Sequence, residues 1–471
     1  MAKQQIDAEY DVIILGAGIA GLVAATSAAE DGLRVALLEK TGDVGGSSAM
    51  SGGFFAFSGT PEQAAHGVED SAGLFLDDLL RVGGHRNDPA LLTAYLENQD
   101  DTYEWLKEHG AHFTALELSS GQSRPRSHLS PIRALLRSLA AQFVRNGGHL
   151  RLDHEATRLI ANESGRVIGA VAKGPDGEVL LQARGGVIIA SGGFSRSREL
   201  IELFAPEQLA AIPYGGKANT GDGLRMAWAF GAGLADVAYI AATYGSHPET
   251  GEQFHELLTA FYMGAIIVNA NGKRFVDESQ SYKTLGSAVL TQPEGLGFQI
   301  FDARVRALSH TGVPLNDIGF LEDLGHVHKA DSLDELAALC QIPPDALRQT
   351  VTEYNDMVQS GSQDLWGRTN LCNGVGDLVT VEASPFYAYP AKALMTSTYC
   401  GVTISPDAHV RNIYGADIPG LYAIGEVTGG FHGKAYMTGT SLGKAAIFGR
   451  IAVRTIAADV NSSGLTPSRS P

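Results

Sequence analysis

The stretch YDVIILGAGIAGLVAATSAAEDGLRVALLEK, residues 10–40, decides the fold. Its apolar run VIIL has the length and flanks of a strand buried in a parallel sheet, and LVAATSAAE continues at helical spacing. A second apolar run ends at Glu39, and Gly16, Gly18 and Gly21 form the pattern G-x-G-x-x-G before the helix. This order of strand, glycine turn, helix, strand and acid predicts an α/β domain of Rossmann type that binds a dinucleotide.

Each of these four residues has a distinct predicted role. Gly16 permits the tight turn, Gly18 lets backbone amides approach a pyrophosphate at the helix N-terminus, and Gly21 lets helix and strand pack closely. Glu39 is predicted to accept hydrogen bonds from ribose hydroxyls. A tight turn without a ligand is the alternative, and the combination of all four features in this context disfavours it.

Further glycine-rich segments indicate a cofactor longer than a nicotinamide dinucleotide. A second glycine-serine loop occupies 41–53, where a simple nicotinamide domain would continue with a helix, and strands ending in small residues occur at 185–194 and 418–426. Segments that return from distant parts of the chain suit one extended cofactor, FAD. The residues predicted to contact it are Gly16, Gly18, Ile19, Ala20, Gly21, Glu39, Lys40, Gly45, Gly46, Ser47, Ser48, Ser51, Gly52, Gly53, Ala190, Ser191, Gly192, Gly193, Asp222, Gly425, Glu426, Ser441 and Leu442.

These motifs, taken as a set over nearly the whole chain, resemble the flavoproteins of the fumarate reductase and succinate dehydrogenase superfamily. The resemblance implies a glutathione-reductase-type FAD domain built from 1–240 and 383–460, with an inserted α+β capping domain at 241–382. Covalently flavinylated relatives attach the cofactor to a histidine, and no histidine lies in 41–53, so the FAD is expected to be non-covalent. The polar tail 461–471 is predicted to be disordered.

The inserted segment has two recognisable patterns. Residues 265–279 read as a hairpin around the Asn-Gly turn at 271–272. Residues 332–361 read as two helices, the second starting at the Pro-Pro pair 343–344. Both patterns fit a mixed α+β domain.

The positions that bind a dicarboxylate in fumarate-reducing relatives hold other residues in this chain. By resemblance, the proton-donating arginine corresponds to Tyr282 and the C-terminal arginine to Tyr436. A carboxylate-binding histidine corresponds to Ser397 and a further arginine to Phe261, so that His247 alone is retained. Two carboxylates without charged donors would be poorly compensated. Fumarate is therefore not the expected substrate.

Tyrosines at these two positions resemble the 3-ketosteroid Δ1-dehydrogenase branch of the superfamily. The segment DESQSY ends at Tyr282, which by resemblance abstracts the proton α to a ketone. The segment YMTGTSLG begins at Tyr436, which by resemblance donates to the ketone oxygen together with the amide of Gly439 or Thr440. The expected reaction is desaturation of a cyclic ketone, with the β-hydride passing to flavin N5.

The size of the ketone stays open between a steroid and a smaller ring. By resemblance, the steroid enzymes have a third tyrosine that supports the base, and no tyrosine lies in the corresponding segment 110–128. A smaller ring such as an oxocyclohexane therefore fits as well as a steroid. A substrate carboxylate could be met by Arg124, Arg126 or Lys434. Packing is the alternative role for each pocket residue taken singly. The residues predicted to line the substrate pocket are Phe113, His247, Phe261, Tyr262, Ser397, Tyr399 and His432.

Composition excludes several classes of partner. The net charge of −17 argues against nucleic acid and anionic membranes. No apolar run approaches the ~18 residues of a membrane span, and no secretory signal pattern precedes the first strand, so the cytoplasm is the expected location. Three widely spaced cysteines form no disulfide framework or metal motif, and no metal site is expected.

Electrons are expected to leave through an external acceptor or O2, because the chain has no haem-attachment motif, iron–sulfur cysteine set or second nucleotide fingerprint. Two alternatives remain. The first is an ene-reductase that runs the same chemistry backwards on an unsaturated acid or enone. The second is an interaction module that binds FAD only structurally, and the tyrosine pair argues against it.

Overall fold

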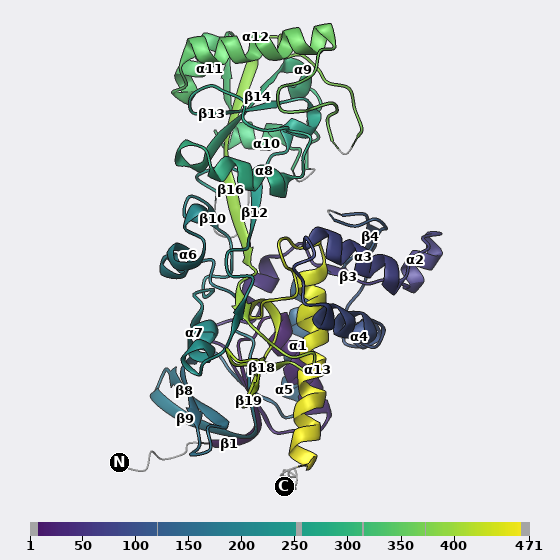
Figure 1. The fold of residues 1–471 in the computed structure, drawn as a ribbon, viewed down its shortest axis with the longest axis vertical. Helices are drawn as coiled ribbons and strands as arrows, with labels where there is room; N and C mark the ends of the chain where they lie inside the picture. Colours follow the sequence, from purple (N-terminus) through teal and green to yellow (C-terminus); the bar gives the residue numbers. More distant parts are fainter. Residues whose placement is uncertain (1–7, 120, 251–256, 313–314, 373, 463–471) are drawn as a thin grey trace. The chain divides into compact units, whose positions relative to one another are not determined.

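The computed structural model describes residues 8–119, 121–250, 257–312, 315–372 and 374–462 (Figure 1). The chain divides into two compact units. Unit 1 comprises Met1–Ala205, Gly215–Ile240 and Ser397–Pro471, and unit 2 comprises Pro206–Tyr214 and Ala241–Thr396. The predicted tail from 463 onward lies outside the described residues. No helix within the described ranges has both the length and the apolar character needed to cross a bilayer.

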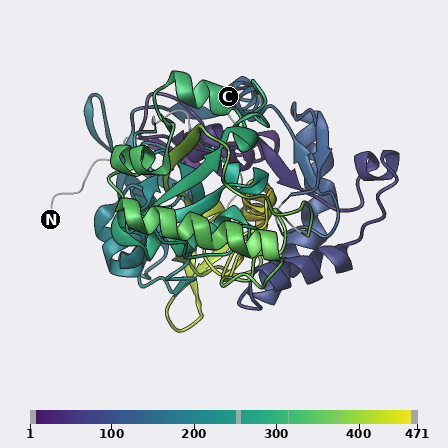
Figure 2. The ribbon, with the colours of Figure 1, turned by 90° about the horizontal axis from the view of Figure 1, so that it is seen from above.

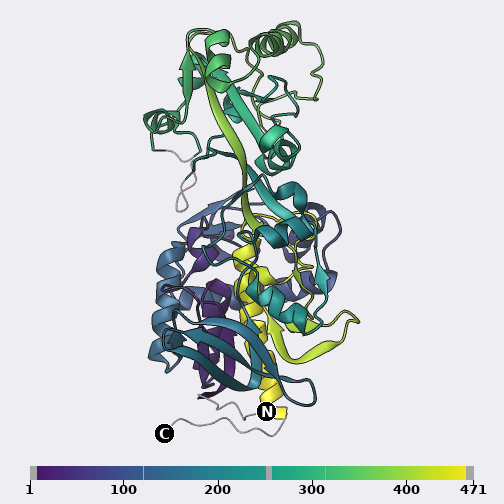
Figure 3. The same ribbon diagram turned by 90° about the vertical axis from the view of Figure 1, so that its left-hand side faces the viewer.

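Unit 1 is built on an eight-stranded sheet with the path β18-β19-β9-β1-β2-β6, from which β8 pairs with β9 and β7 with β8. The central neighbours are parallel, whereas the β7-β8-β9 meander, blue in Figure 3, is antiparallel. The central strands read as apolar runs because both faces of the sheet are covered. The strands are β1 (Ala8–Leu15), β2 (Val35–Leu38), β6 (His149–Arg151), β7 (Glu155–Ala161), β8 (Val167–Gly174), β9 (Gly177–Ile189), β18 (His409–Arg411) and β19 (Asp417–Ala423).

Helix α1 (Ile19–Glu30) contacts both α5 (Ile132–Arg145) and the long C-terminal helix α13 (Thr440–Ser462), which runs beside it in yellow in Figure 1. Ten of the residues of α1 are buried, because helices pack on several sides of it. The first strand, glycine turn, helix and second strand therefore form as the sequence predicts. The other helices of unit 1 are η1 (Gly46–Met50), α2 (Pro61–Ala65), α3 (Ala72–Val82), α4 (Pro89–Glu108), α6 (Arg198–Phe204), α7 (Asp222–Ala229) and η5 (Gly425–Val427).

Two small sheets complete unit 1. Strands β3 (Phe54–Ala56), β5 (Ser127–Leu129) and β4 (Ala115–Glu117) form an antiparallel sheet in that order. Strands β11 (Leu234–Ala235) and β17 (Gly401–Val402) form an antiparallel pair. Both sheets join segments that are distant in the sequence.

Unit 2 is organised around one long strand, β16 (Phe386–Thr398). The sheet has the path β10-β16-β14-β13, and β12 and β15 also pair with β16. The chain was expected to return to the FAD domain at 383, but β16 remains in the sheet of unit 2 and the boundary falls at Thr396. The other strands are β10 (Ile212–Pro213), β12 (Ile240–Ser246), β13 (Ile266–Asn269), β14 (Leu296–Asp302) and β15 (His328–Ala330).

Helices α11 (Leu333–Cys340) and α12 (Pro344–Ser360), the latter being the long green helix of Figure 2, pack on this sheet. Their buried side chains, among them Leu336, Leu347 and Val351, share one core with Ile266 and Ile300 of the strands. Both helices occupy the predicted positions. The other helices of unit 2 are η2 (Pro206–Gln208), η3 (Ala260–Met263), α8 (Tyr282–Leu290), η4 (Pro293–Gly295), α9 (Ala303–Arg306) and α10 (Ile318–Asp323).

The predicted hairpin over 265–279 is wrong in its second strand. The turn forms, with Gly272 at φ 74°, but only the isolated bridge Val268–Arg274 follows it, and β13 pairs with β14. The Arg274 side chain is nearly buried and forms salt bridges to Glu278 at 2.6 Å and Asp364 at 2.5 Å. These contacts draw the chain after the turn away from strand pairing.

Candidate active site

The glycine turn between β1 and α1 brings backbone atoms too close for any side chain. A Cβ on Gly21 would lie 1.9 Å from the Gly16 carbonyl oxygen, and a Cβ on Gly16 would lie 2.5 Å from the carbonyl oxygen of Ala190. Gly18 is the N-cap of α1, and the helix has neither a capping side chain nor an acid in its first turn. Its N-terminus, with Ile19 and Ala20 buried, is therefore suited to an external anion.

Glu39 is held at the end of β2 by contacts to two neighbouring segments. Its Oε2 accepts from the Ala17 amide at 2.9 Å, and its Oε1 accepts from the amide and hydroxyl of Thr41, each at 2.9 Å. The next residue, Lys40, forms a salt bridge of 2.5 Å to Asp222 at the start of α7. The predicted residues of β2 and α7 thus lie side by side.

The second glycine-serine loop folds as the short helix η1 and is tied to the first turn. Gly45 precedes it at φ 121°, and the hydroxyl of Ser48 accepts from the Ile19 amide at 3.1 Å. The Ser51 hydroxyl donates to the Ser48 carbonyl at 2.8 Å. Among the glycines of this loop, Gly46 has open space around it, Gly52 lies against Phe54, and Gly53 lies against the Ser130 carbonyl.

Asn219, which the sequence reasoning missed, links three predicted segments. Its Nδ2 donates to the Ser47 hydroxyl at 3.0 Å and to Glu426 Oε2 at 3.1 Å, and its Oδ1 accepts from the Ser195 amide at 2.9 Å. It lies within the glycine cluster 215–223, so that clustering was the available signal. Asn219 itself is buried.

The end of β9 approaches Glu426 closely. A Cβ on Gly193 would lie 2.5 Å from Glu426 Oε1, and one on Gly192 would lie 3.1 Å from Asn219 Nδ2. Gly425 adopts φ 75°, which aims this segment back toward α1. The buried Ser191 hydroxyl has no hydrogen-bond partner within the part of the chain that the structure describes. An unpaired buried hydroxyl in the segment that lies against the glycine turn fits a polar ligand such as a dinucleotide.

The N-terminus of α13 lies against the sheet that contains β3. The Gly439 carbonyl accepts from the Ala56 amide at 3.1 Å, and a Cβ on Gly439 would lie 2.8 Å from that nitrogen. Both the amide and the hydroxyl of Thr440 donate to the Met437 carbonyl, at 3.2 and 2.7 Å. Ser441 is half-buried and Leu442 is buried in the same first turn.

Three predicted site residues of unit 1 lie together. The rings of Tyr436 and His432 are 5.8 Å apart in an edge-on contact, Tyr399 lies 5.2 Å from His432, and Tyr399 and Tyr436 are 6.2 Å apart. The Tyr399 hydroxyl accepts a hydrogen bond from the Tyr436 backbone, and burial raises the pKa of Tyr399 well above its usual value. Tyr399 is therefore a neutral phenol that orients Tyr436, which is itself half-buried.

Ser397 contacts Glu426, one of the predicted FAD-binding residues, whereas Phe113 lies in a separate aromatic cluster. The Ser397 hydroxyl donates to Glu426 Oε1 at 3.2 Å. Phe113 stacks on Tyr103 at 5.3 Å and contacts His128 at 5.5 Å. Tyr103 belongs to α4 and so lies outside 110–128, the segment that corresponds to the third tyrosine of the steroid enzymes. Only the tertiary structure shows that Tyr103 lies beside Phe113.

In unit 2, Tyr282 is the first residue of α8, which has no acid in its first turn. The Tyr262 hydroxyl donates to the Gln280 carbonyl at 2.9 Å and accepts from the Tyr282 backbone. Burial lowers the pKa of the adjacent Lys283 to about 7. Phe261 is fully buried, and its carbonyl accepts from Arg368 at 2.7 Å. Tyr262 thus supports the start of α8, and Phe261 belongs to the core of this unit.

The three cations predicted to meet a substrate carboxylate differ in whether the protein already binds them. Arg126 is fully buried and forms salt bridges to Asp70 at 2.6 Å and Asp78 at 2.5 Å. The suggestion that it meets a substrate carboxylate is wrong, because both carboxylates already bind its guanidinium. Arg124 donates to backbone carbonyls, whereas Lys434 is exposed.

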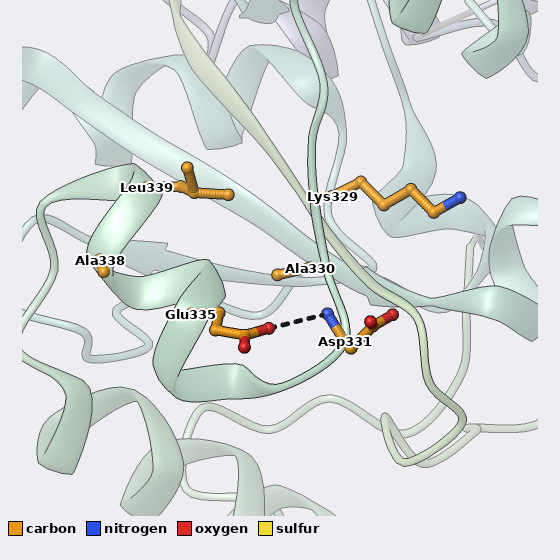
Figure 4. Close-up of a pocket in the computed structure, with 6 residues that line it drawn as sticks. All are labelled: Lys329, Ala330, Asp331, Glu335, Ala338 and Leu339. Atoms are coloured by element: carbon orange, nitrogen blue, oxygen red, sulfur yellow. Dashed lines mark hydrogen bonds between the residues drawn. The ribbon is translucent and has the colours of Figure 1, made fainter.

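An open depression of about 600 Å³ on unit 2 contains none of the predicted residues. It is lined by β15 and α11, where the Asp331 amide donates to Glu335 at 3.2 Å (Figure 4). Its lining of short and charged side chains offers no convergent polar site of the kind that orients a substrate.

Comparison with known proteins supports one family. The sequence profile of the FAD binding domain family matches residues 11–442. The chain is 31% identical over 449 residues to a fumarate reductase (cytochrome) of Shewanella frigidimarina, covering 94% of this chain and 76% of that protein.

Two solved structures have the same fold over nearly the whole chain. The open conformation of a flavocytochrome c3 fumarate reductase is 30% identical with a TM-score of 0.83, covering 96% of this chain and 79% of that one. The 3-ketosteroid-Δ4-(5α)-dehydrogenase of Rhodococcus jostii RHA1 is 26% identical with a TM-score of 0.79, covering 97% and 98%. The α/β fold with an FAD-binding domain and the FAD cofactor are therefore confirmed. The chain belongs to the FAD binding domain family and is an FAD-dependent oxidoreductase related to the fumarate reductases.

Proposed function

We propose that this chain removes two hydrogens from the carbon–carbon bond next to the carbonyl of a cyclic ketone. In this proposal Tyr436 donates a hydrogen bond to the ketone oxygen and Tyr282 accepts the α-proton. FAD, when held non-covalently by the glycine turn and Glu39, would supply the acceptor for the β-hydrogen, which leaves as hydride. The α-proton and the hydride together account for the two hydrogens lost, and the product is the conjugated enone.

The observation that carries the proposal is that Tyr282 and Tyr436, at positions that by resemblance hold arginines in fumarate-reducing relatives, have supported backbones. Each tyrosine has its backbone bound by the hydroxyl of another tyrosine, Tyr399 for Tyr436 and Tyr262 for Tyr282. A phenol is suited to a neutral ketone, because it donates one hydrogen bond without requiring a counter-charge. A dicarboxylate would require cationic donors instead.

The surroundings of Tyr436 support its role as the carbonyl donor. It precedes the N-terminus of α13, and the positive end of a helix stabilises negative charge that develops nearby. The Thr440 amide is already engaged by the Met437 carbonyl. Gly439 is therefore the proposed source of the second hydrogen bond to the ketone oxygen.

The surroundings of Tyr282 support its role as the base. An ordinary tyrosine has a pKa of about 10 and is mostly protonated at neutral pH. Its place at the start of α8 puts the positive end of that helix beside it, and such a helix end stabilises negative charge nearby. Lys283, whose pKa is lowered to about 7, is the further group that we propose assists proton release.

A second candidate function has its own support. The curated relatives include fumarate, urocanate and acrylate reductases, which by their names reduce carbon–carbon double bonds. The Rhodococcus structure, in contrast, is a ketosteroid dehydrogenase in complex with 4-androstene-3,17-dione. In this second candidate the same two tyrosines serve the reduction of an enone, and Tyr282 returns the proton. The two candidates therefore differ in the direction of the reaction.

One anaerobic experiment tests both candidates. The oxidised protein is mixed with a panel of saturated cyclic ketones, including 3-ketosteroids, oxocyclohexane carboxylates and cyclohexanones, and the flavin absorbance is followed. The proposal expects bleaching with at least one ketone and formation of the matching enone. Chemically reduced protein is then mixed with the corresponding enones and with unsaturated acids, and reoxidation measures the reverse reaction.

Fumarate and succinate serve as the charged controls. The proposal expects neither to change the flavin at a useful rate. Rapid reoxidation by fumarate, with no response to any ketone or enone, would overturn the ketone proposal and the interpretation of Tyr282 and Tyr436 as arginine replacements.

A further inference from the structure

A cluster of two histidines and a glutamate lies in unit 2. His247 directly follows β12, and His326 directly precedes the short segment that leads into β15. Both strands pair with β16, which is why residues far apart in the sequence meet here. Glu249 follows His247 in a tight turn, where the Thr250 amide donates to the His247 carbonyl at 3.1 Å.

The two imidazoles lie face to face. Their ring centroids are 3.8 Å apart and their planes differ by 17°. His247 is buried, His326 is half-buried and Glu249 is exposed. One ligand atom from each of the three side chains lies within 4.8 Å of the others.

The positions of both histidines are fixed by the fold. The His326 amide donates to the Leu321 carbonyl at 3.0 Å, which closes the end of α10, and Gly325 before it adopts φ 77°. On the other side, His247 contacts the ring of Tyr389 on β16 at 5.7 Å. The fold thus fixes the backbones of both histidines, whereas their stacked rings must turn about the side-chain bonds before one nitrogen of each can point at the same ion. Glu249 is exposed.

The donor set has a clear chemical preference. Two imidazoles and one carboxylate suit Zn²⁺ and similar divalent transition metals, whereas Mg²⁺ and Ca²⁺ prefer oxygen ligands. Ligation requires neutral imidazole. The Nδ1 of His247 accepts from the Glu249 amide at 3.2 Å.

We propose that His247, Glu249 and His326 bind one divalent transition-metal ion, with Zn²⁺ the best match. The ion joins the end of β12 to the chain before β15 and leaves its remaining coordination positions to water. A single sequence motif does not indicate this site, because its ligands come from separate segments of unit 2. His247 was also predicted to line the substrate pocket; in this proposal it binds the metal instead, whatever the direction of the flavin reaction.

Zinc titration of the FAD-loaded, chelator-treated chain, without a histidine tag, tests the proposal. A competing chromogenic chelator measures affinity and stoichiometry. We expect one tight site in the wild type and in His310→Ala, a control at an exposed histidine of the same unit. Loss of groups that merely support metal ligands lowers affinity about 10–100-fold, so His247→Ala and His326→Ala should each weaken binding by at least about 100-fold.

Two further measurements keep the test decisive if a variant is less stable. Glu249→Gln keeps the size and exposure of the side chain and should weaken Zn²⁺ binding while the flavin spectrum is unchanged. Co²⁺ should give ligand-field absorption beyond the flavin bands in the wild type and not in His326→Ala. Equal Zn²⁺ binding by wild type, His326→Ala and Glu249→Gln, or Mg²⁺ competing equally with Zn²⁺, would overturn the site.

Discussion

At the scale of single residues, the proposed chemistry depends on two phenols whose backbones are bound by the hydroxyls of two other tyrosines. Tyr436 belongs to a cluster with His432 and Tyr399, and Tyr282 stands beside Tyr262. Burial raises the pKa of both supporting tyrosines, so these two remain neutral at physiological pH. A neutral support can fix a neighbouring backbone without competing for the proton that the reaction moves.

Substitution of the two proposed catalytic tyrosines should separate their roles. Tyr282→Phe removes the base and leaves the carbonyl donor, so kcat should fall about 10²–10⁴-fold with KM little changed. Tyr436→Phe removes a hydrogen bond made to the ketone, so binding should weaken by about 0.5–1.5 kcal/mol and flavin reduction should slow further. Stopped-flow flavin reduction and solvent exchange of the α-hydrogen measure the two effects. Near-normal reduction by Tyr282→Phe would reduce that residue to a packing role.

Glu39 should determine affinity for the cofactor. Glu39→Ala leaves the Ala17 and Thr41 amides, and the expected ribose hydroxyls, without an acceptor. Unpaired buried groups of this kind cost about 1–3 kcal/mol, so FAD should bind roughly 5–150-fold more weakly. Flavin fluorescence on titration into apoprotein measures the change. Asp43→Ala in the exposed part of the following loop is the control, and an equal loss in that variant would contradict a specific role for Glu39.

At the scale of elements, α1 is positioned by the absence of side chains at its first turn. Its N-terminus can approach β1 only because Gly21 and Gly16 nearly touch, and the same closeness leaves room for an anion at the helix end. Helix α13 packs on α1 and carries Lys444, a buried cation that is 3% exposed. Packing and cofactor binding in unit 1 therefore depend on the same turn.

Gly21→Ala should separate α1 from β1. Its Cβ would lie 1.9 Å from the Gly16 carbonyl oxygen, which is backbone and can move only with the strand. Overpacking of this kind typically lowers stability by about 1–3 kcal/mol. We expect a lower melting temperature and weaker FAD binding. Gly73→Ala in α3, where the nearest atom would lie at 3.8 Å, is the matched control and should change stability by less than about 1 kcal/mol.

Lys444 should make stability depend on pH in the alkaline range. Its Nζ donates to the Thr428 carbonyl at 3.1 Å, and burial lowers its pKa from 10.5 to about 8. Between pH 8 and 10.5 the unfolded chain keeps a proton that the folded chain has lost, so the free energy of unfolding should rise through this window relative to a chain without the lysine. Melting curves of Lys444→Met should lack that component. The exposed control Lys173→Met should retain it.

At the scale of the whole molecule, the chain passes repeatedly between two units. The boundaries fall at Ala205, Tyr214, Ile240 and Thr396. Unit 1 contains every predicted FAD contact and Tyr436, whereas unit 2 contains Tyr282 and the histidine cluster. The proposed metal site lies within unit 2.

The cofactor should leave the whole chain without bond cleavage. The loop at 41–53, where covalent relatives attach flavin, carries serines and glycines and folds as η1. Acid or heat precipitation should release all the yellow colour into the supernatant as FAD, and the apoprotein should regain its flavin spectrum when FAD is added. Colour that remains on the washed precipitate would show a covalent link and contradict this prediction.

Local patterns in the sequence were sufficient for β1, the glycine turn, α1 and β2 of unit 1 and for α11 and α12 of unit 2. Apolar runs and glycine spacing act between neighbouring residues, so strand, turn, helix and the close approach of Gly16 and Gly21 can be predicted from them. The second strand of the hairpin after Asn269 could not be predicted, because Arg274 forms buried salt bridges to Glu278 and to the distant Asp364 where strand pairing was expected. Local propensity is a weak preference that tertiary contacts override.

The candidate site divides along the same line. The sequence by itself was sufficient to predict the FAD-binding turn and the two tyrosines that by resemblance stand where fumarate-reducing relatives have arginines, since each of these is a motif within a single segment. Only the tertiary structure decided that Arg126 forms salt bridges to Asp70 and Asp78, and that Asn219 is hydrogen-bonded to both Ser47 and Glu426. It alone also brought His247 and His326 into contact. Such pairs are set by strand pairing and burial, which join residues whose separation along the chain carries no local signal.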